Sequence, residues 1–319
     1  MAVGRPRVAI ATGDPGGIGP EISIKAALDP AVRVLCEPVV IGDRGALEKQ
    51  AKACRLSLDG IEIVERAQLR RGELEIGGIN PAHGRAALDS AKAAILGAMQ
   101  GEYDAVVAAP HTETAIHAAG IEFDGYPSFV ARTTGLAPDD GILMLCFGWQ
   151  GREVRIAHVT LHASVAKALG MITTERVART ITAVDAALKK LGIEAPRIAV
   201  SGVNPHAGEG GAFGREDLDI VLPAIDTVRA AGIVADGPIG ADTLIQRPGY
   251  DACVVMLHDQ GHVAAKLLAP NGAAALTIGT PVLFSSVGHG SALDIAGQGR
   301  AEHRAMVEAI TRLVTHRRR

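Results

Sequence analysis

The sequence predicts an α/β protein, in which buried strands alternate with helices around one mainly parallel sheet or a pair of such sheets. Three observations predict this class. Short apolar runs bounded by glycine and proline recur along the chain. Longer stretches with helical periodicity separate them. Aromatic residues are only 3% of the 319 residues, so Ala, Val, Leu and Ile must fill the core, as they do in packed helix–sheet layers.

The strands are predicted where apolar residues run together. In chain order they are Arg7–Ala11, Val34–Ile41, Ile61–Val64, Ala105–Ala108, Val154–Val159, Arg197–Val203, Cys253–Met256 and Leu276–Ile278. The helices are predicted from periodicity, alanine content and start signals. They are Pro20–Ala27, Arg44–Ala53, Arg85–Met99, Thr174–Leu191, Arg215–Ala231 and the amphipathic Glu302–Val314. Pro20 suits a first helical position, and Glu21 places a carboxylate in the first turn.

The charge balance argues against several partners. The 32 Lys and Arg residues against 35 Asp and Glu residues give a net charge of −3, so no basic excess points to nucleic acid or to an anionic membrane. The longest apolar run, Gly141–Phe147, is far shorter than the ~20 residues that span a bilayer. Glycines at 13–17 interrupt the N-terminus before a signal-peptide core could form. We therefore expect a soluble, cytoplasmic protein, with the tail Arg317–Arg319 a solvated end.

The cysteines carry no sign of a metal or disulfide framework. Their spacing contains no CxxC pair, which favours buried free thiols. They are Cys36, Cys54, Cys146 and Cys253.

Three histidines follow predicted strands, where ligands of α/β proteins bind. They are His162, His206 and His258. Neutral imidazoles suit zinc and similar divalent ions, and three protein ligands leave a position open for substrate. Structural or surface histidines would give the same pattern. Spacing alone also leaves three rivals open, namely His158, His262 and His289.

Two glycine-rich loops are candidate cofactor sites. The first contains Gly13, Asp14 and Gly17 between a strand and a helix, where backbone N–H groups can approach an anionic ligand. It matches neither standard nucleotide-binding fingerprint, and a plain tight connection is the alternative. The second runs from Val287 to Gly299, with a short helix expected to begin at Ser291 as its N-cap. Its candidate cofactor-binding residues are His289, Gly290, Ser291 and Asp294.

Taken together, these segments resemble a known family over nearly the whole chain. The two glycine-rich loops are similar to those of the isocitrate and isopropylmalate dehydrogenase fold. The segments 204–210 (NPHAGEG) and 258–261 (HDQG) resemble the 4-hydroxythreonine-4-phosphate dehydrogenase (PdxA) family within it. The resemblance implies two α/β domains around a cleft. We expect the first at 1–124 with 274–319, and the second, carrying the metal ligands and dimer contacts, at 125–273.

The resemblance also implies a site. Three histidines bind a divalent metal in this family, zinc being favoured by nitrogen ligands, and they fall on His162, His206 and His258, with His258 supplied by the second subunit of a homodimer. NAD or NADP is the implied cofactor. Lys266 matches the family lysine and is the expected catalytic or carboxylate-pairing group. A loop that the family uses near the cofactor falls on Gly240, Asp242 and Thr243, of which Asp242 is a second catalytic candidate.

Departures from the family pattern narrow the expected substrate. Tyr126-Pro127 stand where the vitamin-pathway enzyme has His-Thr, and Ala275 and Phe284 stand where it has Asn and Arg. The lost groups are donors for a phosphate, so a flatter, less phosphorylated substrate is expected. The segments 110–117, 125–128, 158–162 and 256–272 resemble the terephthalate dihydrodiol dehydrogenase branch.

That branch oxidises 1,2-dihydroxy-3,5-cyclohexadiene-1,4-dicarboxylate with a nicotinamide cofactor, and decarboxylation gives protocatechuate. The expected substrate-binding residues are His111, Tyr126, Ser128 and Lys266. Two alternatives stay open: a phosphosugar or hydroxythreonine-phosphate dehydrogenase of the same fold, and a metal-dependent hydrolase or binding protein without redox chemistry. The missing Asn and Arg argue against the first, and the glycine-rich loop after Val287 argues against the second.

Overall fold

A computed structural model of the chain describes residues 4–66, 69–270 and 272–314. The described residues divide into two compact units, with the divisions at 138/139 and 279/280: the segments before 139 and after 279 form the first unit, and the segment between them forms the second. The tail at 317–319, which we expected to be a solvated end, lies outside the described residues. The fold is α/β, as predicted, and in the described part of the chain no helix is long and apolar enough to cross a membrane.

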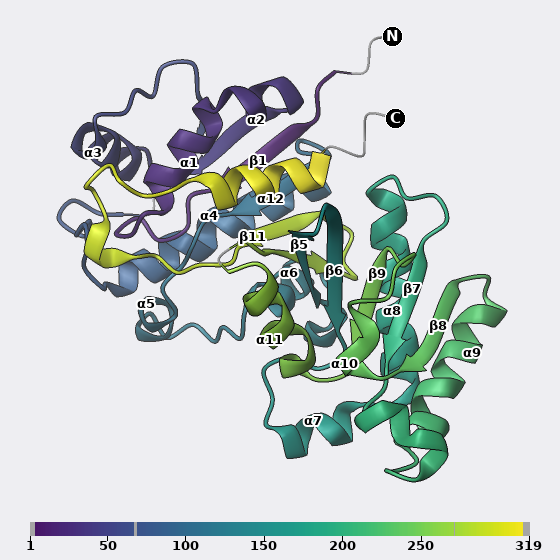
Figure 1. Cartoon of the computed structure of the whole chain (residues 1–319). Coiled ribbons are helices and arrows are strands. Elements are labelled where there is room, and N and C mark those ends of the chain that lie inside the picture. Colours follow the sequence, from purple (N-terminus) through teal and green to yellow (C-terminus); the bar gives the residue numbers. More distant parts are fainter. Residues whose placement is uncertain (1–3, 67–68, 271, 315–319) are drawn as a thin grey trace. The chain divides into compact units, whose positions relative to one another are not determined.

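The first unit is built on a parallel sheet. Its strands lie in the order β3-β2-β1-β4-β11. Their bounds are β1 Arg7–Ala11, β2 Glu37–Gly42, β3 Glu62–Glu65, β4 Ala105–Ala108 and β11 Phe284–Val287. The helices are α1 Gly19–Leu28, α2 Pro30–Leu35, α3 Arg44–Cys54, α4 Pro81–Met99, α5 Glu113–Ala118, α6 Tyr126–Thr133 and α12 Arg304–Val314. The C-terminal helix α12, yellow in Figure 1, packs back onto α1, α2 and β11.

The second unit is built on a mixed sheet in the order β10-β5-β6-β9-β7-β8. β5 is antiparallel to both of its neighbours, β10 and β6, whereas β6, β9, β7 and β8 run parallel to one another. The strands are β5 Ile142–Trp149, β6 Arg152–His158, β7 Arg197–Ser201, β8 Val234–Ile239, β9 Ala252–Val255 and β10 Ala274–Ile278. The helices are α7 Val165–Met171, α8 Thr174–Lys190, α9 Leu222–Ala230, α10 Ala241–Leu244 and α11 His258–Leu268.

Three local predictions need correction. Val34 lies in α2 and not in a strand, because Asp29 caps a helix that starts at Pro30. Ser291 is not a helix N-cap: the short 3₁₀ turn begins at Leu293 after Ala292, whose φ is 41°. The predicted helix after Arg215 starts with one turn of π-helix, Asp217–Val221.

The division between units differs from the one expected at 124/125 and 273/274. Tyr126 and Val130 of α6 belong to the hydrophobic core of the first unit, together with Phe284, and Phe129 packs against this core. The described cysteines carry no disulfide, and three of the four are buried, in agreement with the prediction of free thiols.

Candidate metal centre and substrate site

The three predicted metal ligands follow three neighbouring strands of the second unit. β6, β9 and β7 lie side by side and run parallel. His162 follows β6, His258 follows β9, and His206 follows β7. The carboxyl ends of parallel neighbours meet at one edge of a sheet. The topology therefore brings all three loops to the same edge.

Two of these histidines lie close together. The ring centroids of His162 and His258 are 5.9 Å apart. His258 is the first residue of α11, and its Nδ1 lies 2.7 Å from Oδ1 of Asp259. A carboxylate at that distance favours the tautomer with the proton on Nδ1, which leaves the Nε2 lone pair of His258 available to a metal.

The rival histidines belong to the same cluster. The His262 ring stacks on His258, with centroids 3.8 Å apart and planes within 6°. His158, buried at the end of β6, lies 4.7 Å from His262, and its Nε2 has no hydrogen-bond partner. Burial and the neighbouring imidazoles lower the pKa of His158 to about 3 and that of His262 to about 4. His158 and His262 are thus neutral imidazoles, the form that binds divalent ions, and a cluster of imidazoles fits such an ion chemically.

His206 has different neighbours. Its side chain is 64% exposed, with Nδ1 at 3.4 Å from Oε2 of Glu209 and the ring edge-on to Phe213. A β-carbon built on Gly240 would lie 3.4 Å from Cα of His206 and 2.6 Å from Oδ1 of Asp242, so these two loops are adjacent. Within the described residues, no group of three or more His, Cys, Asp or Glu side chains is arranged to hold a metal. The set of His162, His206 and His258 therefore stays a prediction.

Gln260, which the sequence reasoning did not single out, fixes the turn that carries His258. Its Oε1 accepts the N–H groups of Met256 and Leu257 at 2.9 and 3.0 Å, and its Nε2 donates to the carbonyl of Gly202 at 3.1 Å. The side chain thus ties the end of β9 to the end of β7. A Gln in the first turn of a helix is a known capping signal that could have identified it.

Lys266 lies on the helix face that carries the histidines. It follows His258 and His262 at successive intervals of four residues on α11, so the three share one face. Its positive charge is one of the smaller causes of the lowered pKa of His262, after burial and the neighbouring His258. The lysine is exposed and available to a substrate carboxylate.

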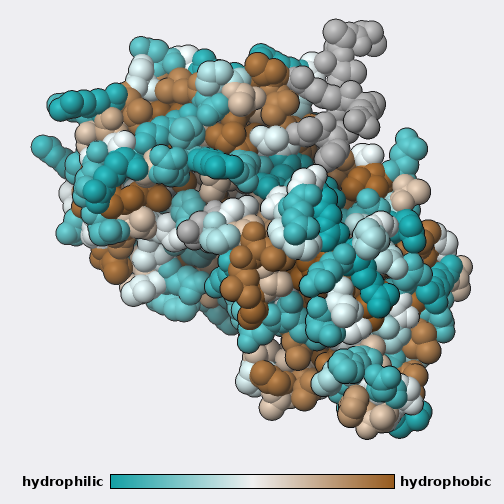
Figure 2. Space-filling view, in the orientation of Figure 1, coloured by the Kyte–Doolittle hydropathy of each residue, from teal (hydrophilic) through white to brown (hydrophobic). Residues whose placement is uncertain are grey.

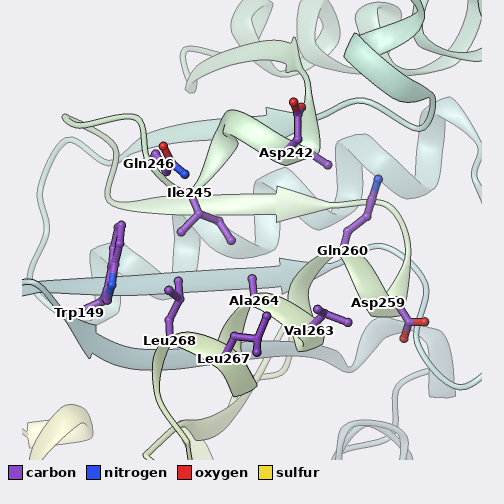
Figure 3. A pocket seen from close by; sticks show the side chains of 11 residues that line it. Trp149, Asp242, Ile245, Gln246, Asp259, Gln260, Val263, Ala264, Leu267 and Leu268 are labelled. Carbon is purple, nitrogen blue, oxygen red and sulfur yellow. The ribbon is translucent and has the colours of Figure 1, made fainter.

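A pocket of about 420 Å3 lies beside this helix (Figure 3). Val263, Leu267 and Leu268 of α11 and Trp149 of β5 form its apolar part, with Ile245 opposite. Asp242, Asp259 and Gln260 also line it. The sequence did not indicate this pocket, because its lining comes from residues far apart along the chain.

The predicted substrate residues of the first unit meet in an aromatic cluster. The His111 ring lies 4.8 Å from both Phe123 and Tyr126, and Tyr126 lies 5.0 Å from Phe284. Burial lowers the pKa of His111 and raises that of Tyr126. The Ser128 hydroxyl hydrogen-bonds to Asp124 and donates to the carbonyl of Gly125.

The two glycine-rich loops of this unit lie against each other. The N–H of Ile18 donates to the carbonyl of Ser291 at 2.9 Å, and a β-carbon on Gly17 would approach Ser291 to 2.7 Å. The N–H groups of Asp14, Gly16 and Gly17 all donate within the unit. This pattern is that of a tight structural connection, and the cofactor role of Gly13, Asp14, Gly17, His289, Gly290, Ser291 and Asp294 stays a prediction.

Comparison with known proteins places the chain in a family. The family model of the pyridoxal phosphate biosynthetic protein PdxA matches residues 34–313. A 1,2-dihydroxy-3,5-cyclohexadiene-1,4-dicarboxylate dehydrogenase of Comamonas sp. is 46% identical over 98% of both chains. A crystal structure of a terephthalate 1,2-cis-dihydrodiol dehydrogenase from Burkholderia xenovorans LB400 has a TM-score of 0.76 and 42% identity over 98% of both chains.

More distant structures share the fold. A 4-hydroxythreonine-4-phosphate dehydrogenase from Klebsiella pneumoniae has a TM-score of 0.85 at 30% identity over 99% of both chains. An isocitrate dehydrogenase from Methylococcus capsulatus has a TM-score of 0.50 at 16% identity, over 98% of this chain and 86% of that one. The predicted isocitrate dehydrogenase-like fold is confirmed.

Proposed function

The chain belongs to the PdxA family and is a dehydrogenase acting on CH–OH groups, and we propose that it oxidises the cis-dihydrodiol of terephthalate to protocatechuate with NAD(P) and a divalent metal. The overall change is transfer of a hydride from the carbinol carbon to the nicotinamide, with removal of the hydroxyl proton, followed by loss of one carboxylate as CO2. The enolate that this leaves takes up one proton to become the aromatic diol, so no net proton is released. Two observations carry the proposal. One is the cluster of imidazoles after β6 and β9, and the other is the 46% identity to a dehydrogenase named for this diol.

His162, His206 and His258 would hold the metal, with zinc the preferred ion. When bound, the ion supplies Lewis-acid polarisation of the hydroxyl oxygen, and the nicotinamide supplies a hydride acceptor. Two neighbouring side chains would orient His258 for metal binding. Asp259 holds the proton of His258 on Nδ1, and the stacked His262 ring fixes the direction of the His258 imidazole.

Charged and polar side chains would hold the dicarboxylate. Lys266 offers an ammonium beside the histidine face, where it pairs with a carboxylate or passes on a proton. We assign His111, Tyr126 and Ser128 lesser roles in substrate binding. Asp242, in the loop next to His206, is proposed as a proton-handling group near the cofactor, and Gly240 and Thr243 of that loop as cofactor contacts.

We further propose a homodimer that shares its active sites across the interface. The described residues contain no group of three or more His, Cys, Asp or Glu side chains arranged to hold a metal, and the His206 ring lies against Phe213, which supports a site completed by a second copy. The same unit exposes Val263 and Leu267 of α11, at 53% and 75%, beside the apolar pocket, and the space-filling view shows hydrophobic residues gathered over this helix (Figure 2). Exposed apolar patches of this kind mark protein interfaces.

A phosphothreonine-type substrate is the second candidate, because solved structures named 4-hydroxythreonine-4-phosphate dehydrogenase match over almost the whole chain. The fully buried Phe284 ring, packed on Tyr126, favours the diol, since neither side chain is a charged donor for a phosphate dianion.

The test is an assay of nicotinamide reduction with purified protein, offering the terephthalate dihydrodiol and 4-phosphohydroxythreonine separately. We expect a kcat/KM for the diol at least about 100-fold higher, which corresponds to roughly 2.7 kcal/mol of discrimination. Efficient turnover of the phosphorylated compound, with none of the diol, would reject the proposed substrate.

A further inference from the structure

The loop that carries His206 has a conformation that side chains rarely adopt. His206, Ala207 and Glu209 have φ values of 52°, 54° and 43°, and the intervening Gly208 has 77°. Left-handed backbone is rare for residues with a β-carbon, and a run of it persists only where surrounding contacts enforce it.

A buried carboxylate enforces it here. Asp217 has no exposed surface, and its Oδ1 accepts the N–H of Val203 at 2.6 Å while its Oδ2 accepts the N–H of Asn204 at 3.1 Å. The N–H groups of Val203 and Asn204 lie at the start of the loop, two to three residues before His206. Hydrogen bonds to an ionised acceptor are stronger than neutral ones, so the carboxylate is a firm anchor.

The packing around this carboxylate leaves no spare room. A β-carbon built on Gly202 would lie 2.7 Å from Cα of Ala207 and 2.9 Å from Oδ1 of Asp217. One on Gly208 would lie 3.2 Å from Oδ2 of Asp217. The start and the middle of the loop therefore both close on the same carboxylate.

The position of Asp217 in its own element agrees with such a role. It opens the π-helical turn Asp217–Val221, a geometry that is uncommon and often found beside functional sites. The preceding Glu216 accepts the side-chain amide of Asn204 at 2.8 Å, which adds a second tie between the turn and the loop.

We propose that Asp217 is a positioning residue, which holds the left-handed loop so that the His206 imidazole is presented at the edge of the sheet. The inference rests on the proposed function and extends it: the position of one proposed metal ligand, His206, depends on a carboxylate outside the proposed ligand set. The alternative is that Asp217 only stabilises the fold. A positioning role predicts that D217N weakens zinc binding, whereas a purely stabilising role predicts a lower Tm with unchanged zinc affinity.

The test uses the full-length protein, stripped of metal, and zinc alone as the probe. Competition with a chromophoric chelator gives the zinc Kd of wild type, H206A, D217N and D219N. Asp219 is the matched control, since it lies in the same turn but is 52% exposed and pairs with Arg215. We expect Kd to rise about 10- to 100-fold in D217N, as for other groups that orient metal ligands, and to stay within about twofold in D219N.

Amide hydrogen exchange of the same metal-free proteins supplies a second readout. Val203 and Asn204 should lose protection in D217N and keep it in D219N. Adding A207G to D217N should restore part of the zinc affinity, because glycine adopts the left-handed conformation without strain. Should D217N fail to fold, G208A replaces it, and the same rise in Kd is expected because its β-carbon would crowd the carboxylate.

Three results would overturn the proposal. The first is a D217N protein with a lowered Tm but a zinc Kd equal to that of wild type. The second is unchanged exchange at Val203 and Asn204. The third is a wild-type protein that binds no zinc, or an H206A variant that binds zinc as tightly as wild type. Either result would reject the proposed metal site itself. The exchange data would then still report whether Asp217 holds the loop.

Discussion

His258 is the residue on which the proposed chemistry depends most closely, and its neighbours define its state. Asp259 lies at Nδ1 and His262 lies against the ring face. With the proton held on one nitrogen, the other is left as a lone-pair donor. The buried His158 beneath them stays neutral because charging it would place a cation in an apolar site beside other imidazoles.

Replacing Asp259 by Asn should weaken the enzyme without unfolding it. The amide can still contact Nδ1 but does not stabilise the N–H tautomer as a carboxylate does, so kcat/KM should fall by about 10- to 100-fold. Steady-state kinetics of D259N measure this, with D226N as the control because Asp226 is an exposed aspartate paired with Arg229. Equal losses in both variants would show that the effect is not specific to His258.

His111 predicts a pH dependence of stability in the first unit. Burial lowers its pKa from the ordinary 6.5, so between the folded value and 6.5 the unfolded chain binds more protons than the folded chain. Stability from this residue is therefore present above pH 6.5 and is lost as the pH falls below it.

The H111F variant removes this titration and keeps an aromatic ring in the cluster. In urea unfolding with a chelator present, we expect the wild type to lose more free energy of unfolding than H111F between about pH 7 and about pH 5. Parallel losses would mean that His111 titrates with the same pKa in the folded and unfolded chains.

At the scale of the element, α1 is held by a buried ion pair. Glu21 is fully buried and accepts from Nζ of Lys25 at 2.7 Å, from Sγ of Cys54 at 3.2 Å and from the N–H of Ala301 at 2.9 Å. Lys25 also donates to the carbonyls of Gly299 and Ala301. The pair thus fastens the segment after the second glycine-rich loop to α1.

Removing this carboxylate should cost much of the stability of the unit. E21A leaves the partly buried ammonium of Lys25 without its counter-charge, and breaking a buried pair in this way typically costs about 3–5 kcal/mol. Denaturant unfolding measures the loss, and E62A is the control, since the exposed pair of Glu62 with Arg7 should contribute about 0–1 kcal/mol. A loss below about 1 kcal/mol in E21A would show that the network is not a stabilising one.

Most elements could be predicted because burial and capping are local signals. β4 and β9 are apolar at every position and β1 is apolar after Arg7, and Pro20 marks the start of α1. The prediction for Val34 was wrong because apolar residues continue from the end of α2 towards β2, so the sequence pattern does not mark where the helix ends and the strand begins. The left-handed turn at His206 and the π-turn at Asp217 depend on contacts between distant segments, which spacing does not report.

The site was predictable in part for the same reason. Strand ends could be recognised, so His162, His206 and His258 are candidates from the sequence, but their choice over His158, His262 and His289 rests on the family resemblance. The ring stack of His262 on His258 requires the coordinates of α11. The motif in segment 258–261 was visible in the sequence, whereas the role of Gln260 in joining two strand ends was not.

At the scale of the whole molecule, an active site shared between two protomers predicts that two inactive variants regain activity when they are mixed. H206A and H258A should each be inactive alone. If one site takes His206 from one protomer and His258 from the other, a heterodimer keeps one intact site of its two. Random mixing, after dissociation and reassociation, should then recover about one quarter of wild-type activity. A mixture as inactive as its components would show that each site is built within one chain.

The central claim is that imidazoles from this chain hold a cation on which oxidation of the diol depends. The most direct measurement is the rate of nicotinamide reduction with the terephthalate dihydrodiol, by wild type and H162A, after removal of metal and again after stoichiometric zinc is restored. We predict that the stripped wild type loses activity by at least about 100-fold and regains it with zinc, and that H162A regains little. Full activity of the stripped wild type would contradict the account.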